Sequence, residues 1–114
     1  MSVRFEVTVN KRRVCIAGIR GNGVVTIGVD RVQRSTQHYP KNYHRKPGGC
    51  SIEEWCRERV SLHVGGARWH DDGDENYGWH LQDMKPGDEI RIRVLPSGKA
   101  TRPKQKVNRR TKGN

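Results

Sequence analysis

The stretch Glu89-Ile90-Arg91-Ile92-Arg93-Val94-Leu95 indicates most clearly how this chain folds. Ile90, Ile92 and Val94 alternate with two arginines, so the apolar side chains fall on one face. This period of two is typical of a β-strand with one buried face and one wet face. Just before it, Lys85-Pro86-Gly87-Asp88 suits a type II turn, which favours Pro at its second position and Gly at its third.

Similar alternation occurs along most of the chain. Residues 3–9 and 12–19 are expected to form a hairpin around Asn10-Lys11, because Asn tolerates the left-handed backbone of tight turns. A third strand is expected over 24–32, with Val25, Ile27 and Val29 facing inward. Gly65-Gly66 is expected to end or bulge a strand that begins at Val60. A further short strand is expected from Tyr77, Trp79 and Leu81, after an acidic turn at 71–75.

One short helix interrupts the strands. Ser51 and Glu54 fit a capping box, which predicts a helix over about 52–58 with Ile52, Trp55 and Cys56 on one face. Val and Ile number 18 and Leu only three, a preference that suits pleated surfaces. The sequence therefore predicts a mainly β (α+β) domain. About six short antiparallel strands form a curved sheet or small barrel, and the helix, Trp69 and Trp79 cap one end.

Charge divides the 114 residues unevenly. Lys and Arg number 23 and Asp and Glu 12, a formal net charge of +11. Residues 96–114 contain seven cations and no acid, residues 1–50 have a net charge of +8, and residues 51–95 have −4. A segment with so few apolar residues cannot offset its ordering entropy. We therefore expect one compact domain at 1–95, with a long basic loop at 33–50, and a disordered basic tail at 96–114.

Composition also excludes some classes of protein. No run approaches the roughly 18 apolar residues of a membrane helix. The first residues lack the apolar region of a signal peptide. Three cysteines without such a signal favour a reducing compartment over a disulfide framework, so we expect a cytoplasmic protein.

Three groups of segments resemble short uncharacterised bacterial proteins. They are Val7-Thr-Val-Asn10 with Val14-Cys-Ile-Ala-Gly-Ile19, Leu62-His-Val-Gly-Gly66, and Lys85-Pro-Gly-Asp-Glu-Ile-Arg-Ile-Arg-Val94. The resemblance covers about a third of the chain. It implies no activity, cofactor or partner.

Four residues could form a metal site. His38, His44, Cys50 and Cys56 are each six positions from the next, and two His with two Cys is a common structural zinc set. The cysteine spacing is wider than in the usual zinc fingers. The alternative is a solvated loop with a buried thiol, and no cofactor is otherwise expected.

Enzymatic motifs are scarce. The chain has no nucleophile elbow, Walker loop or dinucleotide fingerprint. His70 beside Asp71, Asp72, Asp74 and Glu75 is read as a charged turn. His63 and His80 could act as an acid–base pair, but surface histidines are the simpler interpretation. The sequence leans away from an enzyme and assigns no catalytic residue.

Basic residues with interleaved tyrosines favour a nucleic-acid or nucleoprotein partner, because cations neutralise phosphate and Tyr and Arg stack on bases. The candidate residues are Arg12, Arg13, Arg20, Arg34, Tyr39, Lys41, Tyr43, Arg45, Lys46, Lys99, Arg102, Lys104, Lys106, Arg109, Arg110 and Lys112.

Two alternatives remain open. The first is a protein-binding accessory or inhibitor protein, encoded by a mobile element, that acts on another protein. The second is a metal-dependent enzyme such as a nuclease. The sequence leaves the type of nucleic acid, the sequence preference, the oligomeric state and the biological process undecided.

Overall fold

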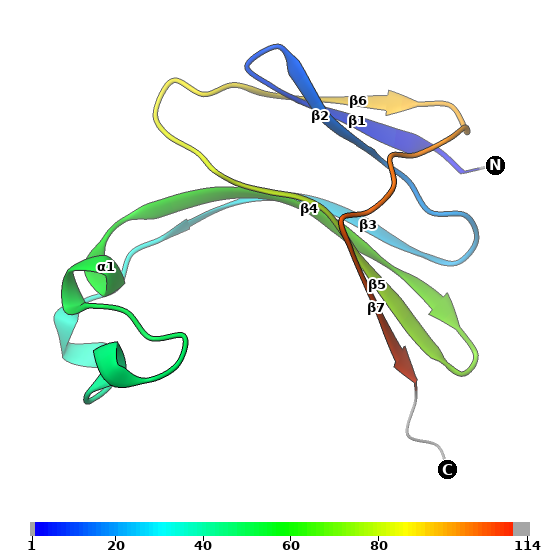
Figure 1. The fold of residues 1–114 in the computed structure, drawn as a ribbon. Coiled ribbons are helices and arrows are strands. Elements are labelled where there is room, and N and C mark those ends of the chain that lie inside the picture. The colour runs from blue at the N-terminus through cyan, green and yellow to red at the C-terminus, as the bar shows by residue number, and fades with distance from the viewer. Residues whose placement is uncertain (1, 111–114) are drawn as a thin grey trace.

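In the computed structural model, which describes residues 2–110, two antiparallel sheets pack face to face (Figure 1). The small sheet has the order β2-β1-β6, and the large sheet has the order β3-β4-β5-β7. The elements are β1 (Arg4–Val9), β2 (Arg12–Ala17), β3 (Gly23–Val32), η1 (Thr36–His38), η2 (Tyr43–Arg45), α1 (Ile52–Cys56), β4 (Arg59–His70), β5 (Gly73–Asp83), β6 (Ile90–Leu95) and β7 (Gln105–Arg110). The mainly β prediction is confirmed, with the strands divided between two sheets.

The predicted turns are present. Asn10 and Lys11 both have positive φ, at 50° and 69°, so β1 and β2 form the expected tight hairpin. Gly87 has φ of 93°, and the Asp88 amide donates to the Lys85 carbonyl at 3.1 Å. Asn10 Nδ2 donates to Asp88 Oδ1 at 2.9 Å, which joins the two turns.

The core lies between the sheets and is small. The small sheet contributes Val7, Val9, Cys15 and Ala17, and the large sheet contributes Leu62, Val64 and Trp79. These residues are at most 5% exposed. Ile92 and Val94 of β6 were expected inside but are 48% and 65% exposed, as is Val29 of β3 at 54%. The two sheets overlap only in part, so these residues are not covered by the opposite sheet. Alternation of apolar and polar residues shows which side chains share a face of a strand, but not whether another element covers that face.

A bulge changes which residues of β5 face inward. The register shifts between Val64 and Gly65 of β4, where His80 and Gly78 are the partners and Trp79 is the extra residue. A bulge of one residue reverses the alternation beyond it. Trp79 is therefore buried, while Leu81, two residues further along the strand, is 77% exposed.

The predicted boundary at residue 95 is corrected. Residues 96–104 run along the domain, and residues 105–110 form β7, which pairs with β5 from Gly73 to Gly78. Strand pairing uses backbone N–H and C=O groups, which every residue except proline supplies in full. A basic segment can therefore add a strand to the edge of a sheet even though it has few apolar side chains. Of the predicted disordered tail, residues 111–114 lie outside the described residues.

The loop at 33–50 folds with α1 into a separate lobe, which we define as residues 33–58 (Figure 1). Ser51 is the N-cap of α1, since its Oγ accepts from the Glu54 amide at 3.2 Å. The helix lies beyond the end of the large sheet, and Trp69 is 52% exposed. The helix and Trp69 therefore do not cap the core.

Candidate functional site

Two adjoining hollows lie beside the small sheet, against the segment of residues 96–103. The first has a volume of about 680 Å³ and the second of about 390 Å³. They share Gly18, Ile19, Arg20 and Ala100, so we treat them as one feature and call it the basic cleft.

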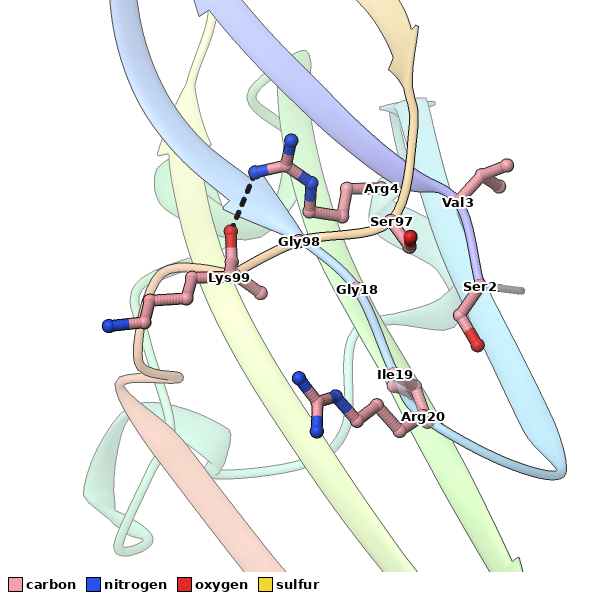
Figure 2. Close-up of a pocket in the computed structure, with 10 residues that line it drawn as sticks. Ser2, Val3, Arg4, Gly18, Ile19, Arg20, Ser97, Gly98 and Lys99 are labelled. Atoms are coloured by element: carbon pink, nitrogen blue, oxygen red, sulfur yellow. Dashed lines mark hydrogen bonds between the residues drawn. The ribbon is translucent and has the colours of Figure 1, made fainter.

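All charged residues that line the basic cleft are cations. Arg4, Arg20 and Lys99 line the first hollow, and Arg20, Arg68 and Arg102 line the second. Figure 2 shows the Arg4 guanidinium against the segment that contains Gly98 and Lys99, Arg20 on the neighbouring stretch after Gly18, and the Lys99 side chain extending away from both. No lining residue is an acid, so the lining itself carries five positive charges and no negative charge.

Arg4 and Thr101 hold the 96–103 segment in place. Arg4 Nε donates to the Pro96 carbonyl and its Nη1 to the Lys99 carbonyl, both at 2.8 Å (Figure 2). The Thr101 amide donates to the Ile16 carbonyl at 2.8 Å, and its Oγ1 accepts from the Ile16 amide at 2.9 Å. The segment thereby acts as a short extension at the edge of β2.

Gly98 allows the Arg4 guanidinium to lie against this segment. A Cβ at position 98 would be 2.8 Å from Arg4 Cζ and 3.0 Å from Nε and Nη2. Any larger residue would push the guanidinium away from the backbone carbonyls that it bonds. The glycine is therefore a local requirement of the wall of the cleft.

Two aromatic residues line the second hollow. Trp79 is 2% exposed, and its Nε1 donates to the Thr101 carbonyl at 2.7 Å, so it supports the segment from below. Tyr77 is half-buried, with its ring centroid 5.7 Å from that of Trp79. Lys106 Nζ lies 5.8 Å from the Tyr77 ring, within cation–π range.

Glu75 is the acid that lies against Tyr77. Its Oε2 is 2.9 Å from Lys106 Nζ and accepts from the Tyr77 hydroxyl at 2.8 Å, while its Oε1 is 2.6 Å from His70 Nε2. Hydrogen bonds from Lys106, Tyr77 and His70, in that order, lower the pKa of Glu75 from 4.5 to about 2. The carboxylate is thus fully engaged and secures β7 to β5.

Some of the predicted binding residues meet at the cleft. Arg20, Lys99 and Arg102 line it, and Lys104 and Lys106 follow on the same segment toward and along β7. Arg109 and Arg110 are paired in register with Asp74 and Gly73 of β5. Lys112 lies outside the described residues.

The other predicted residues lie in two further places. The lobe contains Arg34, Tyr39, Lys41, Tyr43, Arg45 and Lys46. Its tyrosine rings pack edge to face on each other and on Trp55, with centroids 5.5–5.9 Å apart. The Tyr39 hydroxyl donates to the Cys50 carbonyl at 2.6 Å, and the Arg34 guanidinium lies 4.8 Å from the Trp55 ring. These groups stabilise the lobe itself.

Arg12 and Arg13 lie on the small sheet. Arg13 pairs with Glu6 at 3.9 Å, and Arg93 approaches the same carboxylate at 3.5 Å. The hollow there, of about 450 Å³, is lined by both signs of charge, since Glu6 and Glu89 accompany the cations. Its net potential is therefore weaker than that of the basic cleft.

Sequence reasoning missed Arg4, Arg68 and Tyr77 as residues of the cleft. Arg4 belongs to the predicted first strand, where it was not singled out, and Arg68 and Tyr77 belong to strands that the sequence placed only in outline. Their convergence depends on the register of β4 with β5 and on the path of residues 96–103. No local sequence pattern encodes either.

The predicted metal ligands all fall in or beside the lobe. Within residues 2–110, no three His, Cys, Asp or Glu side chains lie close enough to hold one metal ion. Cys15 is buried and Cys50 and Cys56 are half-buried, and all three are free thiols. His63 and His80 were weighed as an acid–base pair, but the register of β4 with β5 places them on opposite faces of the large sheet. His63 instead lies 2.9 Å from Asp30.

Comparison with known proteins adds no relative. No protein-family model, no curated protein and no solved structure matches the chain. Within residues 2–110, none of the helices has the length and apolar character needed to cross a membrane.

Proposed function

We propose that the protein is a non-enzymatic nucleic-acid-binding module whose basic cleft receives a phosphate backbone. The observation that carries the proposal is that two adjoining hollows are lined by five cations and by no acid; the cations are Arg4, Arg20, Arg68, Lys99 and Arg102. Arginine donors recognise phosphate through paired hydrogen bonds, and bound phosphate releases counterions from the nucleic acid.

The cleft favours an unpaired strand over a duplex. Residues that bind single strands combine a basic groove with aromatic rings on which bases stack. Tyr77 is half-buried and lines the second hollow together with Arg68, so its ring is the candidate platform. The tyrosines of the lobe do not line these hollows, and they pack edge to face on each other and on Trp55.

A matched pair of double variants tests this proposal. Arg20→Ala with Arg102→Ala removes two cations from the cleft, and Arg45→Ala with Lys46→Ala removes two from the lobe. Affinity for a labelled single-stranded oligonucleotide is measured by fluorescence anisotropy across a salt series. The cleft variant is expected to bind on the order of tenfold more weakly, with a salt slope reduced by about 1.4 if each arginine contacts one phosphate.

The lobe variant carries the same net charge, so it controls for long-range electrostatics. It is expected to keep the affinity and slope of the wild type to within a few-fold. Equal losses in the two variants would mean that binding follows net charge rather than the cleft. An acidic protein as partner is distinguished by pull-down before and after nuclease treatment, since such a partner would survive the nuclease.

A further inference from the structure

The two sheets have four outer edges, and three of them are protected against pairing. The edge of β2 exchanges backbone and hydroxyl hydrogen bonds with Thr101. Strand β6 carries Arg91 and Arg93, and β7 carries Lys106. Charged side chains along an edge oppose pairing with another copy, because like charges would face each other.

Strand β3 is the exception. It has ten residues, and no charged residue or proline occurs between Gly23 and Val29. Its outer edge makes no backbone hydrogen bond to any other part of residues 2–110. Val24 and Val29 are 42% and 54% exposed. A long, β-branched and uncharged edge of this kind is a template for a further strand.

We propose that β3 pairs antiparallel with β3 of a second copy of this chain, with Ile27 facing Ile27 on the two-fold axis. Residues directly opposite each other in an antiparallel pair point to the same face. The inner faces of the two copies therefore lie on the same side only when the residue numbers of each facing pair add up to an even number. In this register Val25 faces Val29 of the other copy, Thr26 faces Gly28, and Val24 faces Asp30. Residues 23–31 are then all paired.

The register opposes no like charges. Apolar residues meet on the inner face, where Val29 gains the cover that its own chain does not give it. If β6 paired in the same two-fold antiparallel way with β6 of a second copy, Arg91 or Arg93 would lie opposite an arginine of that copy. Self-pairing is therefore specific to β3.

The fold leaves room for this pairing. The small sheet approaches the large sheet most closely through β2 and β5, and β4 separates β5 from the β3 edge. The proposed dimer would have one continuous sheet of eight strands, with both small sheets on the same face. Pairing of nine residues from each chain would supply about nine new backbone hydrogen bonds.

The test measures the mass of the full chain in solution, after nuclease treatment and in high salt, by sedimentation equilibrium. The wild type is expected to sediment at twice the 13.1 kDa of one chain. Val29→Lys is expected to weaken the dimer at least about tenfold, because each copy would bury a lysine against Val25 of the other. A wild type that stays monomeric at high micromolar concentration would overturn the proposal.

Two substitutions at Val24 separate pairing from general damage to the strand. Val24→Lys would face Asp30 of the other copy and is expected to preserve or tighten the dimer, whereas Val24→Glu is expected to weaken it by about tenfold. Thr36→Lys and Thr36→Glu in η1 make the same charge change away from the edge and should match the wild type. Equal dimerisation of Val24→Glu, Val29→Lys and the wild type would exclude the β3 edge. Open-ended polymers would exclude the two-fold pairing.

Discussion

Glu75 illustrates how one side chain secures a strand that the sequence did not predict. It meets Lys106, Tyr77 and His70 within 2.9 Å, and these contacts favour its charged form. The sequence indicated only a charged turn at 71–75. In the structure, Glu75 pairs with Lys106, a cation of β7.

Replacing Glu75 with Gln should make stability less dependent on pH. The pKa of Glu75 is lowered to about 2 by Lys106, Tyr77 and His70. A lowered carboxyl pKa stabilises the fold fully above its ordinary value of 4.5 and ceases to do so as pH falls through about 2. The difference in thermal midpoint between wild type and Glu75→Gln should therefore be largest above pH 4.5 and vanish near pH 2.

Glu53→Gln is the matched control, because Glu53 is exposed in the first turn of α1 and forms no ion pair with a described residue. Hydrogen exchange of β7 amides locates the effect. Faster exchange confined to residues 105–110 is expected in Glu75→Gln. Unchanged exchange in β7 would show that Lys106 does not depend on this carboxylate for docking.

At the scale of the strands, glycines set how closely neighbours approach. Gly66 of β4 faces Val25 of β3, and a Cβ there would be 2.4 Å from the Val24 carbonyl oxygen. Gly78 of β5 is different, because a Cβ there would meet the Gln105 side chain at an ordinary 3.5 Å. Position 78 therefore has room for a Cβ atom, whereas position 66 of the same sheet does not.

We predict that Gly66→Ala destabilises the protein by about 1–3 kcal/mol, since backbone atoms of β3 must shift to accept the methyl group. Gly78→Ala should be neutral or stabilising by up to about 1 kcal/mol, because alanine restricts the unfolded chain. Chemical denaturation followed by tryptophan fluorescence measures both free energies of unfolding. Equal effects of the two variants would contradict the close approach of β3 and β4 at Gly66.

At the scale of the whole molecule, the last part of the chain belongs to the fold. Thr101 bonds Ile16 and Trp79, Arg4 bonds the carbonyls of Pro96 and Lys99, and β7 completes the large sheet. The segment therefore has two roles. It supplies two of the cations that line the basic cleft, Lys99 and Arg102, and it makes contacts to the core.

Truncation should accordingly affect stability as well as binding. A chain that ends at Leu95 loses the hydrogen bond of Trp79 and the pairing of β5 with β7, so its thermal midpoint should fall by several degrees or more. A chain that ends at Arg110 keeps every described contact and should match the full chain. Differential scanning calorimetry measures both, and an unchanged midpoint after truncation at Leu95 would contradict the role of residues 96–110.

Alternation predicted most of the strands, and Asn10, Gly87 and Ser51 predicted their turns and the helix start, because these signals are local. The burial of Val29, Ile92 and Leu81 was not predictable, since it depends on how far one sheet covers the other and on the bulge at Trp79. The basic cleft was predicted only in part. Arg20, Lys99 and Arg102 were identified by charge, while Arg4, Arg68 and Tyr77 join them through the tertiary fold.

The sequence by itself determined that this protein is built mainly of β-strands and carries excess positive charge in two segments. Both properties follow from residue type and spacing, which act over a few positions. Only the tertiary structure decided where those charges meet and which strand edge is left open. Those outcomes depend on pairing between residues far apart in the chain, such as Arg4 with Lys99 and Tyr77 with Lys106, and local patterns carry no record of such pairings.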